Sequence, residues 1–269
     1  MAIDETDVAQ IAILLSPERI ARLGALTGST RKAIELHQET LRVGTSLMNV
    51  LATMEIALRN SVSENLSLHF GNPDWLTNPP KPFQWKDVER NKVNRAVESA
   101  RRAEYSKLSQ NDKAALDGLA FPNGKPANMS HSAKTKRRQA CISVSEGKVI
   151  AEITMHFWKR IYGPDYDQTL WRTSLKKTFP NKSLKRADVA NNLEIIYQNR
   201  NRLAHHEPVL YKRFTETMKA VSFVTDNLGT QRDLTRTPLS RLVEEDVAIV
   251  NEMANGLHAK LDSYRISSP

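Results

Sequence analysis

The side chains best suited to chemistry in this sequence lie close together, between Arg200 and Glu207. Arg200 is permanently charged, and its planar guanidinium can hold a phosphate through two parallel hydrogen bonds. His205 can give or take a proton near neutral pH, because the unperturbed pKa of histidine is about 6.5. Asn201 can hold a phosphate oxygen or fix the tautomer of the imidazole. This combination predicts acid–base chemistry at a phosphate ester.

Three neighbouring residues are candidates for supporting roles. We expect His206 to lie at a helix end or beside the catalytic group, and Glu207 to pair with a nearby cation. Arg202 is expected either to face solvent or to contact phosphate. Adjacent His205 and His206 cannot easily share one metal ion, and the sequence has no HExxH motif or carboxylate cluster to supply further ligands. We therefore expect neither a metal nor another cofactor.

Apolar residues recur at helical spacing from about residue 187, and Arg200 falls on the same stripe as Leu203. Pro208 disfavours helical geometry at the residue before it, so the helix must end close to the histidines. On a straight helix Arg200 and His205 lie about 140° apart. Either the helix unwinds and turns His205 back, or two copies meet so that one Arg200 faces the other His205.

A longer periodic segment predicts a helix from about Thr30 to His69. Glu55 lies on its apolar stripe, where a buried carboxylate is costly unless a cation pairs with it. Arg59, one helical turn later, can reach Glu55 and form an ordinary pair within the helix.

No segment alternates with the period of a strand, so the predicted fold class is all-α, with a long central helix and additional flanking helices. We expect a single domain over 1–269. Residues 108–143 lack apolar periodicity and are predicted to form a loop or insertion. Residues from about 230 to 269 are predicted to form a C-terminal helical extension.

The composition favours an acidic partner. Lys and Arg number 39 against 30 Asp and Glu, which gives a formal charge of +9 and a pI near 9.6. Nucleic acid is the first candidate partner and an anionic membrane surface the second. The single cysteine, Cys141, excludes an internal disulfide framework. The N-terminus lacks a basic signal region and no apolar run approaches about 20 residues, so we expect a cytoplasmic protein without a membrane span.

Several strings, in this order and context, resemble one protein family. Arg200, Asn201 and His205 match the Arg-polar-x-x-x-His signature of HEPN proteins, and RNRLAHHEPV looks like its form in the Abi-like abortive-infection family. The other agreeing strings are MEIALRN at 54–60, HFW at 156–158, TLW at 169–171 and FP at 179–180. Together they cover roughly residues 40 to 210.

The resemblance implies a HEPN-like helical bundle that forms a homodimer, with a composite site at its two-fold axis. It implies a metal-independent endoribonuclease, acting in phage defence or as a toxin, with an antitoxin or other regulator as a further partner. His205 would be the base or the acid in attack by the ribose 2′-hydroxyl, which leaves a 2′,3′-cyclic phosphate. The resemblance also implies that Glu55, Arg59 and Asn60 orient the region of Arg200.

Two other functions fit the same residues. The first is a non-catalytic RNA-binding or regulatory HEPN protein, in which the cations hold RNA without cutting it. The second is an interaction scaffold that binds no RNA. Dependence of binding on salt separates these two, because contacts with phosphate release counterions.

Overall fold

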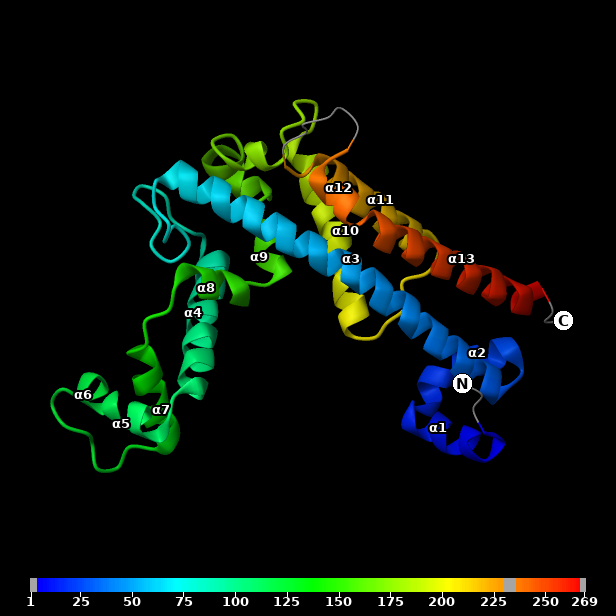
Figure 1. Cartoon of the computed structure of the whole chain (residues 1–269), viewed down its shortest axis with the longest axis horizontal. Coiled ribbons are helices and arrows are strands. Elements are labelled where there is room, and N and C mark those ends of the chain that lie inside the picture. The colour runs from blue at the N-terminus through cyan, green and yellow to red at the C-terminus, as the bar shows by residue number, and fades with distance from the viewer. Residues whose placement is uncertain (1–3, 230–235, 267–269) are drawn as a thin grey trace. The chain divides into compact units, whose positions relative to one another are not determined.

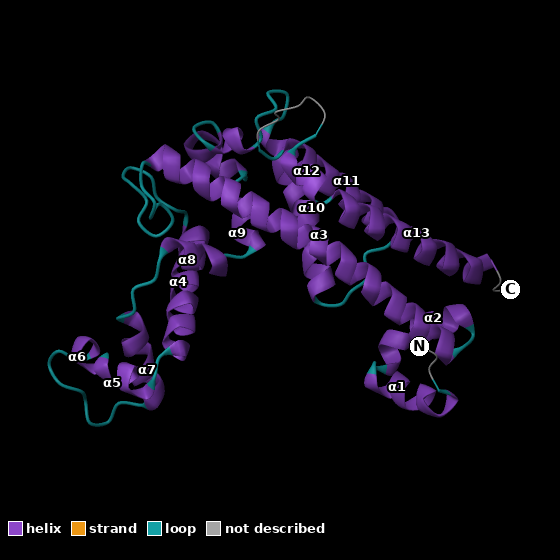
Figure 2. Ribbon diagram, in the orientation of Figure 1, coloured by secondary structure: helices purple, strands orange, loops and turns teal. Residues whose placement is uncertain are grey.

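The computed structural model describes residues 4–229 and 236–266 (Figures 1 and 2). The structure is 75% helix and has no strand in these described ranges, which confirms the all-α fold class. The predicted HEPN-like arrangement of the helices stays a prediction. None of the described helices is long and apolar enough to cross a membrane.

The chain divides into two compact units. The single domain expected over 1–269 stays a prediction. The first unit comprises Met1–Leu58 and Phe179–Pro269, and the second is Arg59–Thr178. The long predicted helix is present as α3, Thr30–Phe70, and its residues are shared between the two units.

The first unit is built on the N-terminal part of α3. Apolar side chains recur there at three- and four-residue steps, and Val43, Leu47, Val50 and Met54 are buried. Along α3 runs α13, whose Lys260 pairs with Glu39 (Figure 1). The other helices of this unit are α1 (Val8–Leu14), α2 (Pro17–Thr27), α10 (Arg186–Ala204), α11 (Tyr211–Asn227), α12 (Pro238–Leu242) and α13 (Glu244–Ile266).

The predicted C-terminal extension corresponds to α12 and α13 over the residues that can be compared. Residues 230–235 and 267–269 of that prediction lie outside the described ranges. Lys32 of α3 lies over the ring of Tyr264, 5.6 Å from its centroid, so α13 contacts α3 at more than one turn. This segment is therefore part of the first unit's packing.

The second unit has an aromatic core. Trp75, Phe157 and Trp158 are fully buried. The rings of Trp85 and Phe157 pack edge to face, with centroids 5.2 Å apart. Such aromatic pairs add to the stability gained from burying their area. The α-helices that lie wholly in this unit are α4 (Asp87–Lys107), α5 (Gln110–Ala115), α6 (Asp117–Ala120), α7 (His131–Ala140), α8 (Glu146–Glu152) and α9 (Met155–Arg160), followed by short 3₁₀ and π turns between Pro164 and Thr178.

Residues 108–143 were expected to form a loop or insertion. The loop alternative was wrong for most of the segment, which forms α5, α6 and α7, and the insertion alternative stays a prediction. Side-chain caps start two of these helices: the hydroxyl of Ser109 accepts from the Asp112 amide at 3.1 Å, and that of Ser130 from the Ala133 amide at 3.2 Å. Asp117 also binds Arg138 through two hydrogen bonds of 2.6 Å. Capping and an ion pair hold helices here without the apolar stripe on which the prediction depended.

Candidate active site

The last turns of α10 carry the predicted catalytic residues. The apolar stripe is buried as expected, at Val189, Leu193, Ile196 and Leu203. Arg200 and Asn201 are half-buried, and His205 is exposed at the position where the helix ends. The buried stripe therefore holds α10 against the core, and the polar C-terminal end of the helix reaches solvent.

Arg200 is positioned by Glu55 of α3. Its Nε lies 3.6 Å from Glu55 Oε2, and the side chains are 39% and 21% exposed, respectively. Glu55 has no other ion pair in the part of the chain that the structure describes. Its carboxylate therefore pairs with a cation of α10, and not with Arg59 of its own helix. Among the described residues no hydrogen bond uses the Arg200 guanidinium, so its N–H donors are available to a phosphate.

Arg59 and Asn60 follow Glu55 on α3 but belong to the second unit. Arg59 is half-buried and Asn60 is exposed. Their expected role in orienting Arg200 stays a prediction.

A Schellman motif ends α10 at the histidines. The His206 amide donates to the Leu203 carbonyl at 2.9 Å, and the Glu207 amide donates to the Arg202 carbonyl at 2.8 Å. His206 has a φ of +57°, the left-handed conformation that this motif requires. Glycine usually occupies this position because other residues are strained there. The helix thus ends before Pro208, as predicted, with an imidazole at the strained position.

We expect His206→Gly to raise the free energy of unfolding by about 1 kcal/mol, because glycine adopts a positive φ without strain. Chemical denaturation of the wild type and the variant measures this difference. His206→Ala is the matched control, since it removes the imidazole but keeps a Cβ at positive φ. An equal gain in both variants would contradict the backbone explanation.

Arg202 and Glu207 form an ion pair of 2.9 Å across the same turn. This confirms that Glu207 pairs with a neighbouring cation. Both side chains are partly exposed, at 37% and 49%, so the pair contributes at most about 1 kcal/mol. Arg202 can exchange this weak partner for a phosphate at little cost.

The other end of the turn is anchored by α13. The Tyr211 amide donates to His258 Nε2 at 3.0 Å, and the Tyr211 hydroxyl donates to Asp262 at 2.8 Å. The rings of Tyr211 and His258 stack with centroids 4.4 Å apart. Neither His258 nor Asp262 was predicted to contact this turn, because nothing local marks contacts across 47 and 51 residues. Segment 205–210 is therefore held at both ends.

We expect the free energy of unfolding to fall as the pH is lowered through about 6.5, the pKa of an unfolded histidine. Burial lowers the pKa of His258, with Asp262 opposing and Arg265 assisting. The unfolded chain therefore binds more protons than the folded chain in this window, and stability decreases toward acid. Denaturation at a series of pH values measures the slope.

His258→Gln keeps an acceptor for the Tyr211 amide but removes the titration. The free energy of unfolding of this variant should change less steeply with pH than that of the wild type. The pH dependence should not vanish, because burial also lowers the pKa of His37 and His156. An unchanged slope in His258→Gln would show that this imidazole does not contribute.

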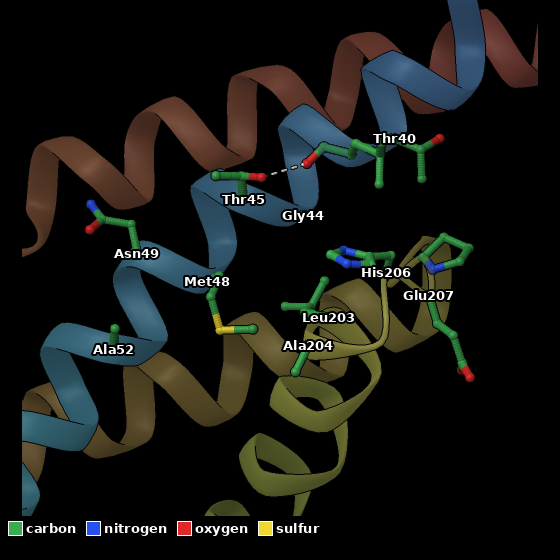
Figure 3. A pocket seen from close by; sticks show the side chains of 12 residues that line it. Thr40, Gly44, Thr45, Met48, Asn49, Ala52, Leu203, Ala204, His206 and Glu207 are labelled. Atoms are coloured by element: carbon green, nitrogen blue, oxygen red, sulfur yellow. Dashed lines mark hydrogen bonds between the residues drawn. The ribbon is translucent and has the colours of Figure 1, made fainter. Parts of the chain in front are cut away.

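A groove of about 450 Å³ opens between α3 and the end of α10. Figure 3 shows His206 projecting toward α3 beside Leu203, whereas the Glu207 carboxylate is directed away from it. A Cβ on Gly44 would lie 3.3 Å from Leu203 Cδ2, so glycine allows this close approach of the helices. From α3 the groove is lined by Thr40, Leu41, Gly44, Thr45, Met48, Asn49 and Ala52.

The groove was not predicted, because its α3 side mixes small, polar and apolar residues whose types carry no chemical signal. It adjoins the end of α10 that carries the exposed His205. Apolar and hydrogen-bonding groups thus lie beside the candidate catalytic residue.

Within 4–229 and 236–266, no group of three or more His, Cys, Asp or Glu side chains is placed to hold a metal ion. No protein-family model matches this chain, and comparisons with curated proteins and with solved structures also find no match.

Proposed function

We propose that this protein is a metal-independent endoribonuclease of the Abi-like HEPN class. The observation that carries the proposal is the end of α10, where Arg200 pairs with Glu55 and His205 is exposed. No hydrogen bond in the described part of the chain uses the Arg200 donors. The formal charge of +9 is consistent with an RNA substrate.

In the proposed reaction a base removes the proton from a ribose 2′-hydroxyl, whose oxygen attacks the adjacent phosphorus. The bond from phosphorus to the 5′-oxygen breaks, and an acid protonates that oxygen. The products are a 2′,3′-cyclic phosphate and a 5′-hydroxyl. Arg200 holds the phosphate as negative charge accumulates on it, and Asn201 holds a phosphate oxygen or the imidazole.

The reaction needs an acid and a base, and His205 supplies one of them. The proposal includes a homodimer in which two copies of the α10 end face one another, so that the second copy supplies the other group. His206 and Glu207 support the site from the helix end, and Arg202 contacts a neighbouring phosphate after leaving Glu207. Phage defence, or growth arrest as a toxin restrained by an antitoxin, is the role that this activity would serve.

The test is incubation of purified protein with RNA in excess EDTA, with DNA of the same sequence as the matched substrate. We expect cleavage of RNA only, with 2′,3′-cyclic phosphate ends. Cleavage of DNA, or RNA products with a 3′-hydroxyl, would contradict attack by the 2′-oxygen. RNA that is bound in a salt-dependent way but left intact would favour the non-catalytic RNA-binding function.

A further inference from the structure

A small pocket in the second unit collects polar side chains that the proposed reaction does not use. It has a volume of about 260 Å³ and is lined by residues of α4 and of the end of α8. These two helices pack against each other and lie side by side in Figure 1. Its polar lining comes from Lys92, Arg95 and Ser99 of α4, and from Glu152 and Thr154 at the junction of α8 and α9. The three α4 residues are spaced by three and four positions, which places them on one face of the helix.

The two cations lack partners within the described part of the chain. Neither Lys92 nor Arg95 has an ion pair there, although Lys92 is half-buried. Among the described residues, the hydroxyls of Ser99 and Thr154 also make no hydrogen bond. Lys92 and Ser99 are half-buried, and a group that is partly withdrawn from water is stabilised by gaining a partner, whereas Arg95 and Thr154 are exposed to solvent. These four groups can therefore provide charge and hydrogen bonds to a ligand.

The surroundings are electropositive. His156 of α9, from the HFW string, has its pKa lowered first by burial and then by the charges of Lys92, Lys159 and Arg160, while Glu89 opposes them. A bound anion near Lys92 would offset this positive field. The unused groups thus lie in a potential that attracts negative charge.

Glu152 is the one carboxylate among the lining residues. It is exposed and forms no ion pair among the described residues. One exposed carboxylate cannot neutralise two cations, so the polar lining remains net positive.

We propose that this pocket binds a phosphate group through Lys92, Arg95 and the hydroxyls of Ser99 and Thr154. The phosphate is either one of an RNA chain or that of a free nucleotide. The first source rests on the proposed function, because it requires that the protein binds RNA, whereas the second does not. In both cases the second unit contributes a phosphate site separate from Arg200.

The first arm of the test measures RNA affinity against salt for the double variant Lys92→Ala, Arg95→Ala. A His205→Ala background prevents cleavage during the measurement. The slope to compare is that of the logarithm of the RNA binding constant against the logarithm of the salt concentration. If RNA is the source, this slope for single-stranded RNA should become shallower by about 0.7 for each phosphate that the variant no longer neutralises. The double variant Lys176→Ala, Lys177→Ala removes two exposed charges from the same unit and should keep the parent slope.

The second arm titrates inorganic phosphate and 5′-AMP while following the His156 imidazole by NMR, with His156→Gln to assign its signal. Phosphate in the pocket should raise the pKa of His156 in the parent protein and leave it unchanged in the Lys92, Arg95 variant. Lys92→Gln, which removes the charge but keeps part of the aliphatic stem, repeats the test if the double variant is unstable.

The outcomes separate the two sources. If the Lys92, Arg95 variant has a shallower salt dependence and phosphate also raises the pKa of His156 in the parent protein, the pocket binds a phosphate of RNA. If only the pKa of His156 rises, the pocket binds a free phosphate or nucleotide. No response to either phosphate and an unchanged slope would overturn the site. A protein that binds no RNA would contradict the proposed function, while the NMR arm would still decide whether the pocket binds phosphate.

Discussion

Replacing His205 with alanine is expected to slow RNA cleavage by about 10²- to 10⁴-fold, the usual contribution of a positioned proton-transfer group. The imidazole is exposed at the end of α10, so its removal leaves the buried stripe of the helix intact. Initial rates of cleavage at saturating RNA, in EDTA, measure the effect. RNA affinity should change little, because the charge that holds phosphate is on Arg200.

Arg200→Lys provides a second test of the same site. Lysine can keep a charge opposite Glu55, but it cannot hold a phosphate through two parallel hydrogen bonds. We expect the loss in cleavage to exceed the loss in RNA affinity, because the guanidinium stabilises the charge that develops during reaction. Equal losses in rate and affinity would mean that Arg200 only binds RNA.

Two exposed residues outside the site provide matched controls. His131→Ala removes an exposed imidazole from α7, and Lys219→Ala removes an exposed charge from α11. Both should cleave RNA at the wild-type rate. If His205→Ala is as active as His131→Ala, the proposed catalytic role of His205 is incorrect.

The sequence was sufficient to predict α3 and α10, because each buries a regular apolar stripe along one face. It was insufficient for α5 and α7, which begin at serine caps and lack a buried stripe. A cap involves one side chain and one amide, so its signal is short and occurs in many loops. Apolar periodicity therefore predicts helices that bury an apolar face better than helices, such as α5 and α7, that bury none.

The candidate site shows the same division. Residue type and spacing were enough to single out Arg200 and His205, and the proline was enough to place the end of the helix. Glu55 entered the prediction only through the family resemblance, and the contact of His258 was not predicted, since both residues reach the site from distant parts of the chain. Local sequence predicts which groups can react, whereas only tertiary packing determines which groups hold them.

Arg160→Ala is expected to lower the free energy of unfolding by about 3–5 kcal/mol, the usual cost of leaving a buried charge without its partner. Glu89 of α4 is fully buried, and its carboxylate accepts from Arg160 Nε. It also accepts from the Tyr166 hydroxyl at 2.7 Å. Removing Arg160 leaves, among the residues that the structure describes, one neutral hydrogen bond to satisfy the buried carboxylate of Glu89.

Two comparisons test this cause. Tyr166→Phe removes the hydrogen bond to the carboxylate and the one that the hydroxyl accepts from the Lys86 amide at 3.0 Å, but it leaves Arg160 in place. It should cost less, about 1.5–3 kcal/mol. Arg90→Ala breaks an ion pair with Asp87 on the same helix, but those side chains are 57% and 82% exposed. Its cost should stay within about 1 kcal/mol. Denaturant unfolding of the three variants measures the order of the effects.

Removing both charges distinguishes an unpaired carboxylate from lost packing. Replacing a buried ion pair with apolar residues of similar volume is often neutral or stabilising. We therefore expect the double variant Glu89→Leu, Arg160→Met to be more stable than Arg160→Ala, although it changes more atoms. If the double variant is the less stable, the arginine stabilises the unit by its packing, and the charge on Glu89 is not the cause of the loss.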